Sequence, residues 1–389
     1  MKKNNMDVVY KYFVDEGLDK KSPKYFQENA SSIIEKMKED IWYQIYEPQG
    51  LEIAKNKMLS LINAEDLPED PLEAVETFIA CNAREIYKIN LSRTQSNRSI
   101  TGSTFENILE LVLLFAGVPV ESQRVLSIAE TRHGKSEKEV DLVVPGSVEY
   151  KIDNMNSKLI SLKTTLRERS EQVAAEQVNI NVPIIYLAHV DDKISQDLML
   201  RCHQQHMKLV TTKKVYNSYL NKAINNINSN EEKISESERL IKENKEQILK
   251  LEEEINRRRV EGGKIRRLEI SLGKLHRQIS KAEQTIDFCT GRRSELESAK
   301  QNVEIFMMTF EDMIQECLEV ASAWEKKYTE EQKNNIGLNY VEMIGRNSDY
   351  EKILLIYMER IMKLRISISD EKSKEILENM KKKYKKRTR

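Results

Sequence analysis

The sequence predicts an α/β core, with a mixed sheet flanked by helices, and large all-α additions that include an antiparallel coiled-coil hairpin. Strand-like and helix-like segments alternate between residues 101 and 220, as such a core requires. Heptad spacing of apolar residues follows between residues 221 and 300. The composition agrees, because 32% of the 389 residues are charged, 6% are aromatic and only 12 are glycine, a balance typical of helix-rich proteins with modest cores.

These patterns divide the chain into four regions. Residues 1–100 are expected to form an N-terminal helical region, and residues 101–220 the α/β core. Residues 221–300 are expected to form the coiled-coil hairpin. Residues 301–389 then form a C-terminal helical region that ends in a basic tail.

The N-terminal region contains three amphipathic stretches, around residues 30–45, 50–62 and 72–90. Pro48 separates the first two, because proline interrupts the hydrogen-bond ladder inside a helix. Trp42 lies in the first stretch, where a buried core position is expected. The alternative for Trp42 is a platform on which an extruded base would stack.

A helix is expected to begin near Gly102, since apolar residues recur at helical spacing after it and Gly117 and Pro119 follow. Glu106 would then fall in the first turn. A carboxylate in that turn complements the helix dipole.

Two strands are predicted at residues 140–145 and 158–163. Because residues two apart in a strand share a face, Ser161 and Lys163 point the same way, and Asp141 is out of phase with its apolar neighbours. A carboxylate and an ammonium at the ends of neighbouring strands suit phosphodiester hydrolysis. The acid can hold a divalent cation, and the lysine can orient water or stabilise negative charge.

A further apolar run at residues 182–187, a helix-like stretch and a short apolar run at residues 207–210 complete a β-α-β order. The predicted core therefore has helices on the faces of a small mixed sheet.

Metal-dependent nucleases of the PD-(D/E)XK superfamily usually have a second acid two residues before the lysine. That position is Ser161 here, so the strand motif is incomplete. Glu176 lies 13 residues after Lys163, two helical turns beyond Arg169, where it can replace the missing acid. This arrangement resembles the type II restriction endonucleases of the EcoRII and CCGG/CCNGG-cutting group, in their migrated-glutamate variant. The matching residues are Asp141, Ser161, Lys163, Arg167, Glu168, Arg169 and Glu176.

The resemblance covers roughly residues 100–220 and implies a restriction-endonuclease-like core. It implies that Asp141 and Glu176 ligate Mg²⁺, with Lys163 positioning the attacking water. It also makes Glu106 a candidate acid near the metal, since a helix before the sheet often supplies one in such nucleases.

The cluster Arg167-Glu168-Arg169 can read adjacent G·C pairs, because arginine binds guanine O6 and N7 and glutamate accepts from cytosine N4. A homodimer would present two clusters to double-stranded DNA, so the expected target is a palindrome with CC and GG halves. The halves could abut or straddle a central base pair. The resemblance also implies a cognate DNA methyltransferase in the same system.

The competing interpretation is a coiled-coil structural or DNA-tethering protein in which a nuclease-like fold serves binding alone. Lysine plus arginine equals aspartate plus glutamate at 63 each, so no global basic field supports DNA binding. The end of the chain, residues 381–389, is strongly basic and could touch phosphates or remain a solvated tail.

The four cysteines are widely spaced, so neither a disulfide framework nor a zinc site is indicated. His203 and His206 have no third ligand in view and are expected to be surface or packing residues. Neither a signal segment nor an apolar run long enough to span a bilayer is evident. We expect a prokaryotic, cytoplasmic protein without a membrane partner.

The hairpin prediction rests on two heptad series separated by a glycine pair, Gly262-Gly263. The second series runs in steps of three and four from Ile265 to Cys289. Basic clusters flank the tip at residues 257–259 and 264–267, which favours an intramolecular hairpin with a tip near DNA over a dimerisation arm. The first series consists of Ile227, Ile234, Ile241, Ile248 and Ile255.

Apolar residues in the C-terminal region, such as Met307, Met308 and Phe310, indicate further helices between residues 301 and 380. We expect these helices to pack as a bundle on the core.

Overall fold

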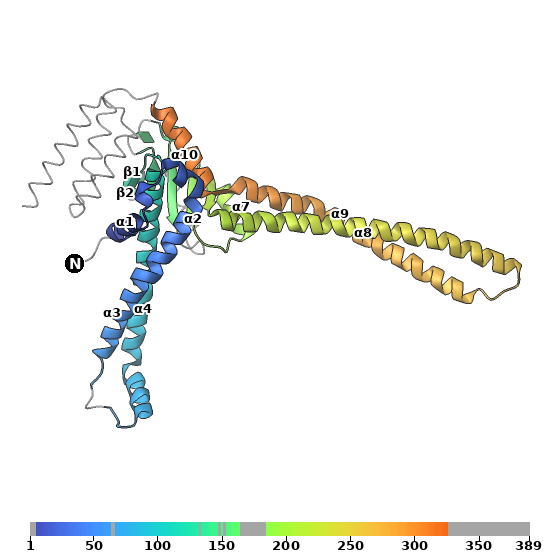
Figure 1. Ribbon diagram of the computed structural model, residues 1–389, viewed down its shortest axis with the longest axis horizontal. Helices are drawn as coiled ribbons and strands as arrows, with labels where there is room; N and C mark the ends of the chain where they lie inside the picture. Colours follow the sequence, from blue (N-terminus) through green and yellow to red (C-terminus); the bar gives the residue numbers. More distant parts are fainter. Residues whose placement is uncertain are drawn as a thin grey trace, which may run out of the picture. The chain divides into compact units, whose positions relative to one another are not determined.

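The structure is a computed structural model, and it describes residues 5–63, 67–131, 134–146, 149–150, 153–163 and 184–325. It divides into two compact units (Figure 1). The first combines the chain up to Lys213 with the chain from Met308, and the second is Lys214–Met307. Among the described helices, none has both the length and the apolar character that crossing a bilayer requires.

The first unit is built on a mixed sheet whose six described strands follow one another in sequence order. The first three strands pair antiparallel, whereas β3, β4 and β5 run parallel. This arrangement confirms the predicted mixed sheet. The strands are β1 (Glu121–Thr131), β2 (Gly134–Val144), β3 (Lys158–Lys163), β4 (Ile185–His189), β5 (Met207–Thr211) and β6 (Met307–Thr309).

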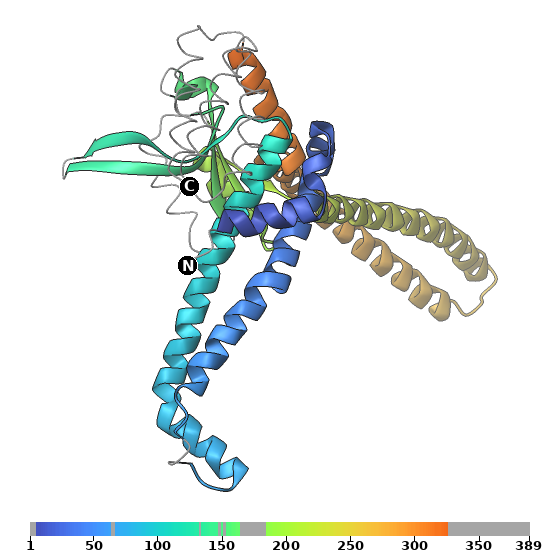
Figure 2. The same cartoon turned by 60° about the vertical axis from the view of Figure 1, so that its left-hand side comes forward.

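Three of these strands differ from the prediction. β1 was not predicted, although it forms a long hairpin with β2 that projects from the rest of the sheet (Figure 2). β4 lies a few residues later than the expected run at 182–187. Met307 and Met308 lie in strand β6 and not in a helix, because they extend the sheet before α10 begins.

The parallel strands β4 and β5 are joined by helix α7 (Gln196–Gln204), which confirms the predicted β-α-β order. The Ser195 side chain starts this helix by accepting a hydrogen bond from the Leu198 amide at 3.1 Å. Leu198, Met199 and Cys202 are buried on its inner face. Helix α7 therefore forms the crossover connection between the parallel strands β4 and β5.

Six helical segments precede the sheet in the part of the chain that the structure describes. They are α1 (Asn5–Asp15), α2 (Pro23–Ile41), the π-helical turn η2 (Trp42–Tyr46), α3 (Glu47–Leu59) and α4 (Pro71–Phe115), with a short 3₁₀ turn, η1 (Leu18–Lys20), between α1 and α2. The expected break at Pro48 is wrong, because Pro48 lies in the first turn of α3, where a missing N–H costs little. Helical structure therefore continues from α2 through η2 into α3.

Helix α4 is far longer than expected and joins two predicted stretches, 72–90 and 102–116, into one helix of 45 residues. The side chain of Asp70 caps it by accepting hydrogen bonds from the Leu72 and Glu73 amides at 2.9 and 3.0 Å. The expected start near Gly102 is wrong, and the expected boundary between residues 100 and 101 falls inside this helix. Glu106 therefore lies in the last third of α4 and not in a first turn.

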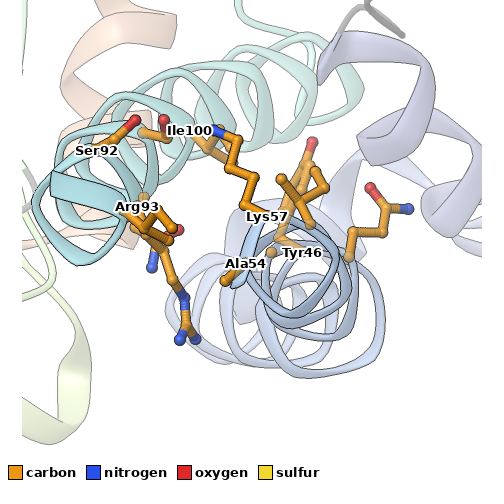
Figure 3. Close-up of a pocket in the computed structure, with 12 residues that line it drawn as sticks. Tyr46, Ala54, Lys57, Ser92, Arg93 and Ile100 are labelled. Atoms are coloured by element: carbon orange, nitrogen blue, oxygen red, sulfur yellow. The ribbon is translucent and has the colours of Figure 1, made fainter. Parts of the chain in front are cut away.

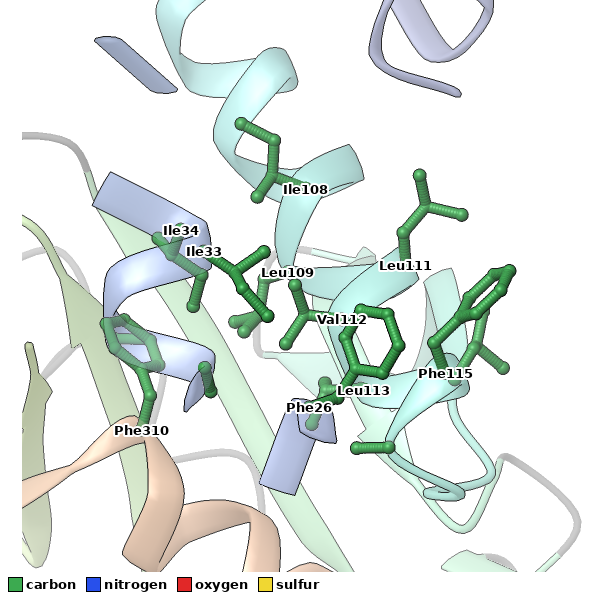
Figure 4. Packing of buried hydrophobic residues seen from close by; sticks show 14 of the residues in the cluster. Phe26, Ile33, Ile34, Ile108, Leu109, Leu111, Val112, Leu113, Phe115 and Phe310 are labelled. Atoms are coloured by element: carbon green, nitrogen blue, oxygen red, sulfur yellow. The ribbon is translucent and has the colours of Figure 1, made fainter. Parts of the chain in front are cut away.

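Helices α2 and α4 pack on one face of the sheet together with α10 (Phe310–Glu325) (Figure 4). Phe26 and Ile34 of α2, Leu109 and Val112 of α4, and Phe310 form the centre of this core (Figure 4). The sheet contributes Leu142, Ile160, Leu162, Tyr186 and Ala188. This face is thus closed by apolar packing, and the residues that alternate with these sheet residues belong to the other face.

A buried carboxylate ties α2 to α10. Glu311 accepts hydrogen bonds from the Ser31 amide at 2.9 Å and from the Ser31 hydroxyl at 2.6 Å, and the Lys213 ammonium lies 3.4 Å away. Ser31 Oγ in turn accepts from the Lys213 amide at 2.9 Å. One carboxylate therefore holds together three segments that are far apart in the sequence.

Replacing Glu311 with alanine should lower the free energy of unfolding by about 3 kcal/mol, because the buried Ser31 amide and hydroxyl both lose their acceptor. Urea unfolding of the purified protein measures this change. Glu319→Ala, at an exposed position of the same helix, is the control and should stay within about 0.5 kcal/mol of the wild type. Equal stability of the two variants would contradict the structural role of Glu311.

The second unit is a helical pair, α8 (Lys213–Val260) and α9 (Arg266–Phe306), whose helices lie side by side (Figure 1). Gly262 has φ 69° in the connecting turn, a conformation that favours glycine. Asn230 Nδ2 donates to the Cys289 carbonyl at 2.9 Å, and Arg293 lies 3.5 Å from Glu231. Arg259 lies 3.2 Å from Glu269 beside the connecting turn, so contacts farther back along α8 fall farther forward along α9 and the helices run antiparallel.

Burial along α8 repeats every seven residues, but on two series of positions. Ile248 and Ile255 of the predicted isoleucine series are buried. A second series of three polar residues, which the sequence analysis did not single out, is buried as well. These residues are Asn230, Ser237 and Asn244.

Candidate active site

Asp141 and Lys163 meet on one face of the sheet. Strands β2 and β3 are antiparallel with Leu142 opposite Ile160, so Asp141 follows opposite Ser161. The Lys163 ammonium lies 3.4 Å from Asp141 Oδ2. The side chains of Lys163 and Asp141 keep 15% and 26% of their exposure, so solvent reaches both. The structure thus brings together the acid and the lysine predicted at neighbouring strand ends.

The Asp141 carboxylate is held by the strand beside it. Oδ2 accepts a hydrogen bond from the Leu162 amide at 2.6 Å and one from the Ser161 hydroxyl at 3.2 Å. All the contacts of this carboxylate that the structure describes are made by Oδ2. Oδ1 therefore has no donor among the described residues and is available to a cation.

The donor set at this position fits a hard divalent cation. Mg²⁺ prefers carboxylate oxygens and usually takes only one or two of them together with water and phosphate oxygens. Asp141 supplies one such carboxylate in an orientation fixed by the Leu162 amide. In the part of the chain that the structure describes, no cluster of three or more acid, histidine or cysteine side chains adds to it.

Four of the predicted site residues lie outside the described residues, in the segment 164–183 that follows Lys163 directly. They are Arg167, Glu168, Arg169 and Glu176. Their roles therefore stay predictions.

Glu106 and Trp42 lie in described helices. Glu106 is half-buried in α4, between the buried residues Phe105 and Ile108. Trp42 is the first residue of the π-helical turn η2 and packs, partly buried, against the core of the first unit. This packing agrees with the core position expected for Trp42. Its role as a base-stacking platform stays a prediction, although π-helical turns are frequent at functional sites.

His189 was missed by the sequence analysis. It is the residue of β4 in register with Lys163 of β3, so the two side chains share a face. The His189 ring is fully buried, and this burial lowers its pKa to about 4. Its signal in the sequence is a single histidine at the end of an apolar run, which does not distinguish it from a packing residue.

Lys38 of α2 is also perturbed. Burial lowers the pKa of its ammonium, and the charges of Asp191, Glu35 and Asp192 oppose that effect. Asp191 and Asp192 lie two and three residues after His189, the last residue of β4. The Lys38 ammonium of α2 therefore interacts with the charges of Asp191 and Asp192, which lie just beyond the end of β4.

A separate cleft lies between α3 and α4 (Figure 3). Its volume is about 130 Å³, and Tyr46, Lys57 and Arg93 are among its lining residues. Neither Asp141 nor Lys163 lines it. The cleft is therefore not part of the site described above.

Comparison with known proteins decides the family. The sequence model described as EcoRII C terminal matches residues 63–234, a range that contains Asp141 and Lys163. The type II restriction enzyme SsoII from Shigella sonnei is 37% identical over 206 residues, which cover 53% of this chain and 67% of SsoII. The chain belongs to the type II restriction endonucleases.

Solved structures agree with this assignment. Metal-depleted Ecl18kI in complex with uncleaved, modified DNA is similar with a TM-score of 0.65 and 26% identity, over 93% of this chain and 94% of that chain. A second Ecl18kI structure, with uncleaved DNA, gives a TM-score of 0.64 over 92% and 93% of the two chains, also at 26% identity. This restriction endonuclease is therefore a site-specific nuclease that binds DNA, and the face around Asp141 and Lys163 is its candidate active site.

Proposed function

We propose that this restriction endonuclease hydrolyses double-stranded DNA in an Mg²⁺-dependent reaction at a palindrome with CC and GG halves. The observation that carries the proposal is the Asp141–Lys163 pair, with its 3.4 Å contact, at the end of β3, immediately before the segment that holds the predicted reading cluster. The halves either abut as CCGG or flank a central base pair.

Asp141 and Glu176 would hold the cation, with Glu106 as a candidate further acid. Mg²⁺ held there supplies Lewis acidity toward the phosphate oxygens. Lys163 orients the attacking water and stabilises negative charge on the phosphate as the bond breaks. The 2.6 Å bond from the Leu162 amide keeps Asp141 directed at the same point. The resemblance to the migrated-glutamate variant supports Glu176, because Ser161 provides no second carboxylate.

Two-fold symmetry would complete the recognition. A homodimer presents two copies of Arg167, Glu168 and Arg169, each suited to G·C pairs. A central unpaired base would give Trp42 its stacking role. A cognate DNA methyltransferase would protect the same palindrome in a prokaryotic cytoplasm.

Incubation of a plasmid of known sequence with the protein and Mg²⁺ tests the proposal. Discrete fragments whose ends map to CC and GG halves are expected. An absence of fragments, combined with retained DNA binding, would favour the alternative of a DNA-tethering protein that uses the fold for binding alone. Fragments that end at other sequences would reject the proposed target and keep the nuclease assignment.

Replacing Arg167 with alanine should weaken binding to the mapped site by about tenfold to a hundredfold, because one bidentate arginine–guanine pair contributes about 1–3 kcal/mol of discrimination. Affinity for unrelated duplex should change little, since phosphate contacts dominate it. Binding titrations on both duplexes at one salt concentration measure the two effects. An equal loss on both duplexes would show a phosphate-binding role for Arg167 in place of base reading.

We also propose that α8 and α9 form a coiled coil whose basic tip contacts DNA phosphates. The seven-residue spacing of the buried positions on α8 supports the coiled coil, and Arg257, Arg258 and Arg259 in its last turn supply positive charge. Deletion of residues 231–296 should then lower the affinity for nonspecific duplex and reduce its salt dependence. Unchanged affinity and salt slope would exclude the phosphate contact and leave the helical pair as a strut or a dimerisation arm.

A further inference from the structure

The residue beside the candidate catalytic lysine is a fully buried histidine, His189. His189 and Lys163 are register partners in the parallel strands β4 and β3, so their backbones lie about 4.8 Å apart and their side chains project from the same face. The His189 ring has no exposed surface. Among the residues that the structure describes, neither Nδ1 nor Nε2 makes a hydrogen bond of good geometry, although the backbone and the carboxylate of Asp191 lie close enough to oppose the effect of burial on the pKa of the ring.

An imidazole in this state is unusual, because buried polar groups in proteins are nearly always hydrogen-bonded. An apolar side chain would fill the position of His189 equally well if the position served packing alone. Leu187, which lies two residues earlier on the same face of β4, is such a side chain. The unused hydrogen-bonding capacity lies beside the ammonium on which the proposed chemistry depends. Burial also keeps the ring neutral by lowering its pKa, so one nitrogen is an acceptor and no charge repels Lys163.

We propose that His189 is a positioning residue for Lys163, whose ammonium donates a hydrogen bond to the imidazole in the cleaving complex. In the structure that ammonium has Asp141 Oδ2 as its counter-ion at 3.4 Å. A cation on Asp141 Oδ1 shares the negative charge of this carboxylate and so weakens the pairing of Oδ2 with Lys163. His189 then gives the ammonium a neutral acceptor at the strand end and keeps it directed at the attacking water.

Loss of this acceptor should slow the chemical step and leave DNA binding intact. Removing a group that orients a functional side chain typically lowers the activity by about tenfold to a hundredfold. The inference rests on the role proposed above for Lys163.

Two matched pairs of variants test the inference. The first pair is His189→Gln and His189→Met, which introduce side chains of similar length with and without an amide. The second pair is His189→Asn and His189→Leu, which introduce side chains of similar shape with and without an amide. Cleavage of a duplex that carries the mapped site is measured in single turnover with the full-length protein and saturating Mg²⁺. Affinity for the same duplex without metal and thermal unfolding are measured in parallel.

At least one amide variant should cleave within about threefold of the wild type, whereas both apolar variants should cleave about tenfold to a hundredfold more slowly at unchanged affinity. Wild-type rates in His189→Met and His189→Leu would overturn the inference. Equal slowing of each amide variant and its apolar counterpart would also overturn it, because shape alone would then explain the effect. Wild-type cleavage by Lys163→Ala would instead refute the role proposed for Lys163, on which the inference rests.

Discussion

Lys163→Ala should lower the single-turnover rate of DNA cleavage roughly a thousandfold, which is the effect of removing one preorganised electrostatic group from a hydrolytic site. The physical reason is local, because Lys163 supplies the positive charge found 3.4 Å from Asp141 at the reacting end of β3. Affinity for the mapped duplex, measured without metal, should change by less than tenfold. A quenched time course at saturating enzyme measures the rate.

Lys158→Ala is the matched control for this prediction. Lys158 begins the same strand, but it belongs to the opposite face, where it lies 3.9 Å from Glu316 and over the ring of Tyr186. Its removal should leave the cleavage rate within a few-fold of the wild type. Equal loss in both variants would indicate damage to β3 in place of a catalytic role, and persistent cleavage by Lys163→Ala would remove Lys163 from the site.

Glu176→Ala should abolish cleavage to a similar extent, because Ser161 cannot supply the second carboxylate of the metal site. Ser161 instead donates a hydrogen bond to Asp141 at 3.2 Å, so this position supports the first acid and does not add another. Cleavage rates across a range of Mg²⁺ concentrations measure the change, and partial recovery at high Mg²⁺ is expected if Glu176 is a ligand.

Glu171→Ala provides the comparison, since it removes a carboxylate from the same segment without removing the predicted ligand. It should cleave like the wild type. Full activity of Glu176→Ala would show that the second acid comes from elsewhere, and Glu106 would then be the first alternative to replace.

The pairing of Asp141 with Lys163 was predictable because it depends on short-range rules. Alternation set the phase of each strand, and strands that follow one another in the chain are usually neighbours in a sheet. His189 lay beyond these rules. Its neighbour in the sheet is 26 residues earlier in the chain, and only the β3–β4 register shows that it lies beside Lys163.

The helical errors have the same origin. Pro48 was expected to end a helix, yet it lies where a new helical segment begins, because the π-helical turn before it shifts the ladder. α4 was expected as two helices because Gly102 and its polar neighbours interrupt the apolar pattern. Its second half packs against α2 and the sheet, and this burial outweighs the weak local propensity.

By itself, the sequence determined the kind of chemistry: an acid and a lysine in the phase of neighbouring strands, and a serine where a second acid is usual. These features follow from residue type and spacing, which folding does not alter. Only the tertiary structure decided what surrounds them, namely the Leu162 amide on Asp141, the buried imidazole of His189 beside Lys163 and the buried Glu311 that joins α2 to α10. These contacts join residues distant in the chain, and burial sets their strength, so no local pattern encodes them.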